Sequence, residues 1–258
     1  MPYETTSLQL SPRGIATIVL NRPDRGNAFN QTMLNELGRQ LSDLAQGATA
    51  RVVVLRGSGK HFCSGADVAG RGGDASEQAG PQYTLHEILA ALDTHPKPTV
   101  AIVHGAAVGG GAAFAACCDV VVASEAAFFS IPEVRIGMAP VRLAPLFIRA
   151  MGYRSFRRYG LSGERITASE ALRIGLAHEV CPTADLEKTA ADLIEALLHG
   201  APGALRKLKQ AAADLATPPL PSAVADAAEH GFGRSPESIE GLASFREKRK
   251  PNWYPAPQ

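Results

Sequence analysis

Four short runs rich in β-branched residues constrain the fold of this chain most strongly, because stretches with helical periodicity separate them. The runs are IATIVL (15–20), RVVVLR (51–56), TVAIVH (99–104) and VVVAS (120–124), and each predicts a largely buried strand. Between the first two, apolar residues recur three or four apart from Asn30, a possible N-cap, to Gly47. Strands that alternate with helices indicate an α/β core.

Helical patterns dominate the second half of the chain. Two amphipathic helices are expected in ADLEKTAADLIEALLHG and APGALRKLKQAAADLATPP, split at Gly200 and Pro202. Other helices are expected from about Gln82 to Pro96, at the capping-box spacing of Thr167 and Glu170, and from Pro236 after a Ser235 N-cap. We therefore predict a core over residues 1–195 and a helical C-terminal region over 196–258.

The overall charge and the cysteines exclude several classes of partner. The 258 residues carry a net charge of +1, which gives no global field to hold nucleic acid or an anionic membrane. The chain lacks an uncharged apolar run of membrane-spanning length, so we expect a soluble cytoplasmic protein. Four cysteines without metal-type spacing are expected to be buried free thiols: Cys63, Cys117, Cys118 and Cys181.

Three consecutive glycines, Gly109 to Gly111, stand in VGGGAAFAACCD between a predicted strand and an alanine-rich helical segment. In that position free backbone N–H groups at a helix N-terminus favour negative charge. Close packing of the helix explains such a cluster equally well. The dinucleotide fingerprint G-x-G-x-x-G is not present.

A second glycine turn, KHFCSGADV (60–68), follows the strand predicted over 51–56. Gly65 allows a sharp turn, so the N–H of Ala66 can face the same cleft as the glycine cluster. Two such loops can direct two amides at one carbonyl oxygen, which is the geometry of an oxyanion hole.

Other catalytic constellations are weaker. Ser64 in FCSGA lacks the first glycine of G-x-S-x-G. His61, His86 and His104 lie in separate segments, and no set of His, Asp and Glu has metal-ligand spacing. We therefore expect neither a nucleophilic triad nor a metal site.

Five segments in this order and spacing resemble the crotonase family, the enoyl-CoA hydratase/isomerase superfamily: LNRPDRGNAFN, FCSGADV, VHGAAVGGGAAFAACCD, IPEVRIG and FREKRKPNW. The resemblance covers nearly the whole chain and is closest to bacterial methylglutaconyl-type hydratases. It implies an α/β spiral of ββα units with a helical C-terminal region, and a homotrimer or homohexamer. It also implies an acyl-CoA thioester as substrate, so that coenzyme A belongs to the substrate and no cofactor is bound permanently.

The resemblance also assigns catalytic positions. The amides of Ala66 and Gly110 would hold the thioester carbonyl, and Glu133 would carry the proton. Ala113 stands where the family's hydratases place a first glutamate, so one of their two acids is missing. From spacing alone, Glu133 is also compatible with an exposed turn residue after Pro132.

The substrate's coenzyme A part would meet further positions by the same analogy. Arg25 and the backbone around Ser64 and Asp67 would meet the nucleotide, and Gly109 would line the substrate site. In the C-terminal segment, Phe245 and Lys248 would pack against CoA, although a solvated helix face explains this charge run as well.

The reaction that the resemblance favours is hydration of a 2-enoyl-CoA to a 3-hydroxyacyl-CoA. The main alternative is isomerisation of a 3-enoyl-CoA to a 2-enoyl-CoA, for which a single carboxylate suffices. Decarboxylation, thioester hydrolysis and a non-catalytic CoA-binding role are the remaining alternatives. A glycine-rich loop over residues 68–82 is expected to cover the acyl pocket.

Overall fold

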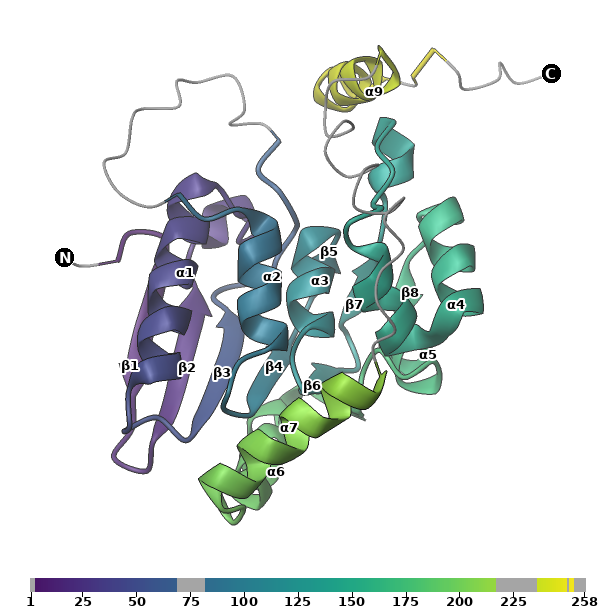
Figure 1. Ribbon diagram of the computed structural model, residues 1–258. Coiled ribbons are helices and arrows are strands. Elements are labelled where there is room, and N and C mark those ends of the chain that lie inside the picture. The colour runs from purple at the N-terminus through teal and green to yellow at the C-terminus, as the bar shows by residue number, and fades with distance from the viewer. Residues whose placement is uncertain (1–2, 69–81, 217–235, 250, 253–258) are drawn as a thin grey trace.

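A six-stranded, mostly parallel sheet forms the centre of the computed structural model, which describes residues 3–68, 82–216, 236–249 and 251–252. The strand order is β1 (Thr6–Leu10), β2 (Ile15–Leu20), β3 (Val52–Gly57), β4 (Thr99–Val103), β6 (Val120–Ser124) and β9 (Glu179–Cys181) (Figure 1). Strands β1 and β2 pair antiparallel, and each later neighbour pairs parallel. All four strands predicted from β-branched runs are confirmed within one residue at either end.

Both faces of this sheet are covered, which is why its strands read as continuous apolar runs. Helices α1 (Gln31–Gln46), α2 (Leu85–Asp93) and α3 (Gly110–Ala116) lie side by side on one face (Figure 1). On the other face Val52, Val54 and Ile102 pack against α6 (Leu186–Leu198).

Helix caps explain where the first helices begin. The Asn30 side chain accepts a hydrogen bond from the Met33 N–H at 3.0 Å, as predicted. A full capping box that the sequence analysis did not single out starts α2, where Thr84 and Glu87 bond reciprocally. At Thr167 only the hydroxyl half of the expected box forms, because the Glu170 carboxylate bonds elsewhere.

A smaller three-stranded sheet brings two turns to one edge. It contains β5 (Ala106–Val108), β7 (Phe128–Ser130) and β8 (Ile166–Thr167), with β5 and β7 parallel. Strand β5 leads into the glycine cluster, and β7 leads into the 3-10 turn η2 (Glu133–Ile136). Because Val108 pairs with Ser130, the two segments that follow start side by side.

The remaining elements surround this framework. They are the 3-10 turns η1 (Pro23–Arg25) and η3 (Thr183–Asp185) and the helices α4 (Ala144–Ser162), α5 (Ala168–Arg173), α7 (Pro202–Ala216) and α9 (Pro236–Arg246). Helices α6 and α7 are separate, as Gly200 and Pro202 predicted. Pro236 begins α9, whereas Ser235 lies outside the described residues.

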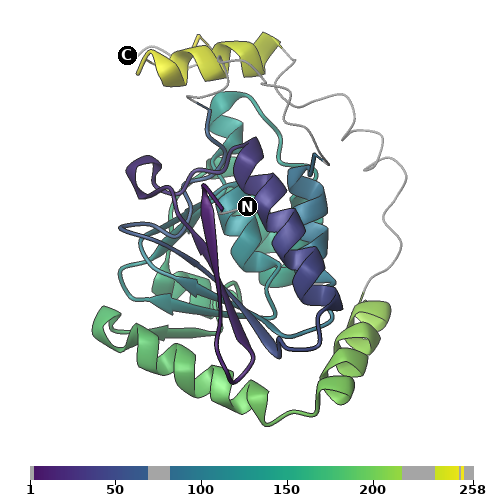
Figure 2. The same cartoon turned by 90° about the vertical axis from the view of Figure 1, so that its left-hand side faces the viewer.

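Helices α7 and α9 lie at opposite ends of the molecule, and both views agree on this (Figures 1 and 2). The division at residue 195 stays a prediction, and α6 runs through that point. Most of the loop expected over 68–82 lies outside the described residues. Among the helices that are described, none has both the length and the apolar character needed to cross a membrane.

Candidate active site

The glycine cluster forms a sharp turn between β5 and α3. Gly109, the N-cap of α3, has φ 54° and ψ −122°, a conformation that side chains rarely allow. Its N–H donates to the Ser130 carbonyl at 2.8 Å. The turn leaves Gly110 as the first residue of a short helix, where backbone N–H groups lack partners within the helix.

Glu133 opens η2, the turn that follows β7. The residue is partly buried, and its Oε2 atom is fully buried without a hydrogen-bond partner in the described part of the chain. Burial raises the pKa of this carboxyl to about 7, with a small opposing effect of its own backbone N–H. A carboxyl with this pKa can accept and release protons near neutral pH.

Glu133 lies against the glycine turn. A Cβ on Gly109 would stand 2.6 Å from Glu133 Oε1, so only glycine leaves room for the carboxyl at this place. Because β5 and β7 pair in parallel, the segments that follow them begin side by side. These two segments meet at Gly109 and Glu133.

The loop over residues 62–68 runs beside β5 and supplies the second predicted amide. Gly65 adopts φ 99°, and a Cβ there would be 3.0 Å from the Val108 carbonyl oxygen. Phe29 pairs with Ala66, and the same Phe29 ring fills the space where Gly110 would carry a Cβ. Among the described residues, the N–H groups of Ala66 and Gly110 donate to no protein acceptor.

Cys63 and Ala113 complete the packing behind these loops. The Cys63 side chain and carbonyl fill the space beside Gly111, and burial raises the pKa of the Cys63 thiol to about 12. Ala113 is fully buried inside the core cluster. Neither side chain can exchange protons with a ligand at neutral pH, whereas the Glu133 carboxyl has a pKa of about 7. All four cysteines are buried and free, as predicted.

The residues predicted to meet a nucleotide come together where η1 touches the 62–68 loop. The Ser64 N–H donates to the Gly26 carbonyl at 3.0 Å, and its hydroxyl donates to the Arg25 carbonyl at 3.2 Å. Arg25 itself is exposed. The Asp67 carboxylate forms an ion pair with Arg22 at 2.9 Å.

Asn27 is a supporting residue that the sequence analysis missed. It is fully buried at φ 57°, its Oδ1 accepts from the Arg22 N–H, and its Nδ2 donates to the Ser58 and His61 carbonyls. Asparagine after glycine in RPDRGN is a signal for such a conformation, since asparagine tolerates positive φ better than most residues. Asn27 fixes η1 against the loop that carries Ala66.

Helix α9 places the two predicted C-terminal residues near this region. Arg246 donates to the Val68 carbonyl at 3.4 Å, which brings the helix end to the loop after Ala66. Phe245 is 58% exposed. Lys248 has φ 53°, and the N–H groups of Lys248 and Arg249 bond back to the Phe245 and Ser244 carbonyls, as in a Schellman motif.

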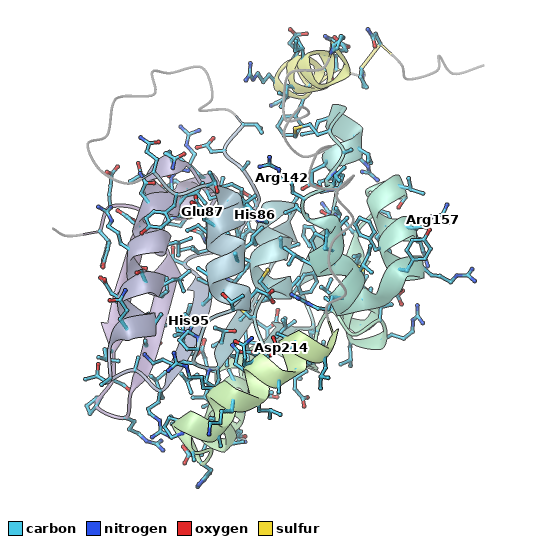
Figure 3. The ribbon with its side chains drawn as sticks, viewed as in Figure 1. His86, Glu87, His95, Arg142, Arg157 and Asp214 are labelled. Atoms are coloured by element: carbon cyan, nitrogen blue, oxygen red, sulfur yellow. The ribbon has the colours of Figure 1, made fainter. Side chains whose placement is uncertain are left out.

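The three histidines considered in the sequence serve structural roles or face solvent. His61 Nδ1 accepts from the Ala106 N–H, His104 Nε2 contacts the Gly59 carbonyl, and His86 is exposed at the start of α2 (Figure 3). Over the ranges that the structure describes, no three His, Cys, Asp or Glu side chains are arranged to hold a metal ion.

Comparisons with known proteins agree with this architecture. The family model described as enoyl-CoA hydratase/isomerase matches residues 11–255. A probable enoyl-CoA hydratase of Rhodobacter capsulatus is 36% identical over 260 residues, which cover 98% of this chain and 99% of the relative. A crystal structure of an enoyl-CoA hydratase from Mycobacterium avium subsp. paratuberculosis superposes with a TM-score of 0.83 at 29% identity, covering 98% of this chain and 100% of that chain. A structure of an enoyl-CoA hydratase/isomerase from Pseudoalteromonas atlantica gives a TM-score of 0.84 at 25% identity, covering 97% and 100%.

Proposed function

Because the chain belongs to the enoyl-CoA hydratase/isomerase family and is an enzyme with the crotonase fold, we propose that it hydrates a 2-enoyl-CoA at the site of Glu133. The observation that carries the proposal is the buried Glu133 carboxyl, with its unpaired Oε2, held against Gly109. Within the described part of the chain Oε2 has no partner to satisfy, so this atom is available to a ligand.

The thioester carbonyl would accept hydrogen bonds from the Ala66 and Gly110 amides. These donors withdraw electron density from the conjugated double bond and stabilise the enolate that forms when oxygen adds to the β-carbon. Removing one donor of such a pair typically costs about 10²- to 10³-fold in rate. The unengaged state of both N–H groups within the described chain supports this assignment.

Glu133 would move the proton in both half-steps. Its carboxylate takes a proton from water as the oxygen adds to the β-carbon, and the resulting acid returns a proton to the α-carbon of the enolate. One water is thereby added across the double bond and the carboxylate is regenerated. A pKa of about 7 suits a group that must serve in both forms at neutral pH.

Isomerisation of a 3-enoyl-CoA is the second candidate, and the buried Ala113 favours it. Without a second carboxyl at that position, Glu133 alone can remove a proton from the α-carbon and return it to the γ-carbon. The same amide pair would stabilise the dienolate between the two transfers. This reaction needs no ordered water, which is its advantage at a one-acid site.

The C-terminal region is proposed to join chains into a trimer or hexamer. Helix α7 supports this, because Leu208 and Leu215 are 67% and 89% exposed in the single chain. Exposed leucines on one amphipathic helix favour contact with another protein surface. Light scattering on the purified protein measures the assembly, and a monomer at all concentrations would contradict the proposal.

Absorbance of the enoyl thioester separates the two reactions. With crotonyl-CoA, hydration removes the conjugated absorbance, whereas with 3-hexenoyl-CoA isomerisation creates it. We expect Glu133→Gln to lose either turnover while retaining acyl-CoA binding. Glu125→Gln, at an exposed turn, is the matched control that keeps activity. Full activity in the Glu133→Gln protein would refute the assigned role.

A further inference from the structure

The η2 turn that carries Glu133 is held from one side by α4. Arg135 donates from Nε and Nη2 to the Ser162 carbonyl at 3.1 and 3.0 Å, at the C-terminal end of that helix. Gly163, at φ 61°, leaves the space that the Arg135 side chain occupies. The turn is thus fixed to the body of the protein through its third residue.

Helix α9 holds the same turn from the other side. Gly241 of α9 is buried, and a Cβ there would stand 2.3 Å from the carbonyl carbon and oxygen of Ile136, the last residue of η2. These are backbone atoms, which cannot swing aside as a side chain can. Helix α9 can pack this closely against η2 only because residue 241 is glycine and has no side chain.

Other contacts tie α9 to the rest of the site. Arg246 reaches the Val68 carbonyl, next to the loop of Ala66, so α9 touches both segments proposed to act on the substrate. The Glu240 carboxylate accepts from Arg249 at 2.6 and 2.9 Å and from the Asn252 N–H at 2.8 Å, which fixes the chain after the helix. The figures show α9 over the end of the molecule where η2 lies (Figures 1 and 2).

We propose that Gly241 is a positioning residue, which seats α9 on Ile136 and thereby sets where the Glu133 carboxyl lies relative to the glycine turn of α3. The catalytic role of Glu133 rests on the proposed function, whereas the position of its carboxyl does not. A displacement of about 1 Å at a reacting group can cost about 10²-fold in rate. Lifting α9 would also admit water to the carboxyl and move its pKa toward the ordinary range.

Burial is the largest cause of the raised pKa of the Glu133 carboxyl, and several charged groups around η2 have partners of their own. Arg142, on the segment that joins η2 to α4, is exposed to solvent (Figure 3). Arg135 bonds to Ser162, and on α9 Arg249 pairs with Glu240 and Glu247. On α4, Arg149 pairs with Asp93 and Arg158 pairs with Glu164. Arg154 and Arg157 line a pocket formed by α4 residues, and Arg157 lies over the Tyr153 ring. Lys248 lies beyond the C-terminal end of α9, whose last residue, Arg246, donates a hydrogen bond to the Val68 carbonyl.

The test compares Gly241→Ala with Gly203→Ala. Gly203 is also helical, but a Cβ there meets no atom within 4 Å, so its substitution adds the same methyl group without crowding. The two hydrophobic core clusters include no described residue of α9, so the Gly241→Ala protein is expected to fold, and its melting curve checks this.

The readout is the titration of Glu133, followed by ¹³C NMR of glutamate labelled at the δ-carbon and assigned with Glu133→Gln. We expect the Gly241→Ala protein to titrate Glu133 at a lower pH than the wild type and to lose about 10²-fold in kcat. Gly203→Ala should match the wild type in both. A folded Gly241→Ala protein with unchanged titration would overturn the proposal, whether or not kcat falls. Wild-type protein inactive on both enoyl-CoA substrates would refute the proposed function, while the titration would still decide the role of Gly241.

Discussion

Oε1 of Glu133 lies beside Gly109, only 2.6 Å from the position that a Cβ would take if residue 109 were any other amino acid. The contact joins two segments that are 24 positions apart in sequence and that follow paired strands, β5 and β7. The glycine cluster therefore has a second use besides exposing an amide. It makes room for the acid beside the proposed oxyanion site.

Gly109→Ala should lower kcat by about 10²-fold, because the new methyl group displaces the Glu133 carboxyl. The substitution also strains a backbone at φ 54°, so a control must share that strain. Gly152→Ala is suitable, since Gly152 has φ 78° but a Cβ there meets no atom within 4 Å. Steady-state kinetics on both proteins separate crowding from strain. Equal losses of activity in the two would argue against a special contact at Gly109.

The pKa of Glu133 predicts a stability effect whose sign can be worked out. The folded-state pKa of about 7 lies above the ordinary 4.5, so between these values the folded protein keeps a proton that the unfolded chain has released. The stability from protonated Glu133 is complete below pH 4.5 and is lost as the pH rises through 7. We expect Glu133→Gln to become more stable than the wild type by about 3 kcal/mol above pH 7.

Urea unfolding of both proteins from pH 4.5 to 8 measures this difference. The gap between the two free energies of unfolding should open with rising pH and level off above 7. Glu125→Gln, which removes a carboxylate at an exposed turn, is unfolded in parallel as the control for the loss of one acid. A constant gap across the range would mean that Glu133 titrates alike in the folded and unfolded states.

Asn27→Ala should destabilise the fold by about 3 kcal/mol, since the change removes four hydrogen bonds and leaves a β-carbon at φ 57°. Asn27→Gly loses the same bonds but adopts the conformation freely, so it should cost about 1 kcal/mol less. Chemical denaturation of the two variants checks the order. If the glycine protein were the less stable one, backbone strain would not be part of the cost.

The sequence predicted the long buried strands, but not how the short segments meet, and its catalytic and CoA-binding residues stay predictions. The runs that became β2, β3, β4 and β6 were recognisable because both faces of the sheet are covered. Strands β5, β7 and β8 have two or three residues each, too few for any periodicity to appear. Yet these strands bring Gly109 to Glu133.

Contacts between segments that lie far apart in the chain could not be predicted from one sequence. Gly241 looks like any glycine in a polar helix until Ile136 is found against it. The same holds for Asp67, which was expected near the nucleotide and forms an ion pair with Arg22. The amide roles of Ala66 and Gly110 stay predictions, now supported by N–H groups that bond to no described protein acceptor.

Lys248 provides a test in which stability and function should move in opposite directions. It occupies the C′ position after α9 at φ 53°, where glycine is the favoured residue, so Lys248→Gly should stabilise the protein by about 1 kcal/mol. If its ammonium pairs with a phosphate of CoA, the same change should raise KM for acyl-CoA several-fold and leave kcat nearly unchanged. Lys248→Arg keeps both the charge and the strain, and it should resemble the wild type in thermal melting and in KM. If the Lys248→Gly protein were more stable but kept the wild-type KM, Lys248 would have no role in binding CoA and would only end the helix.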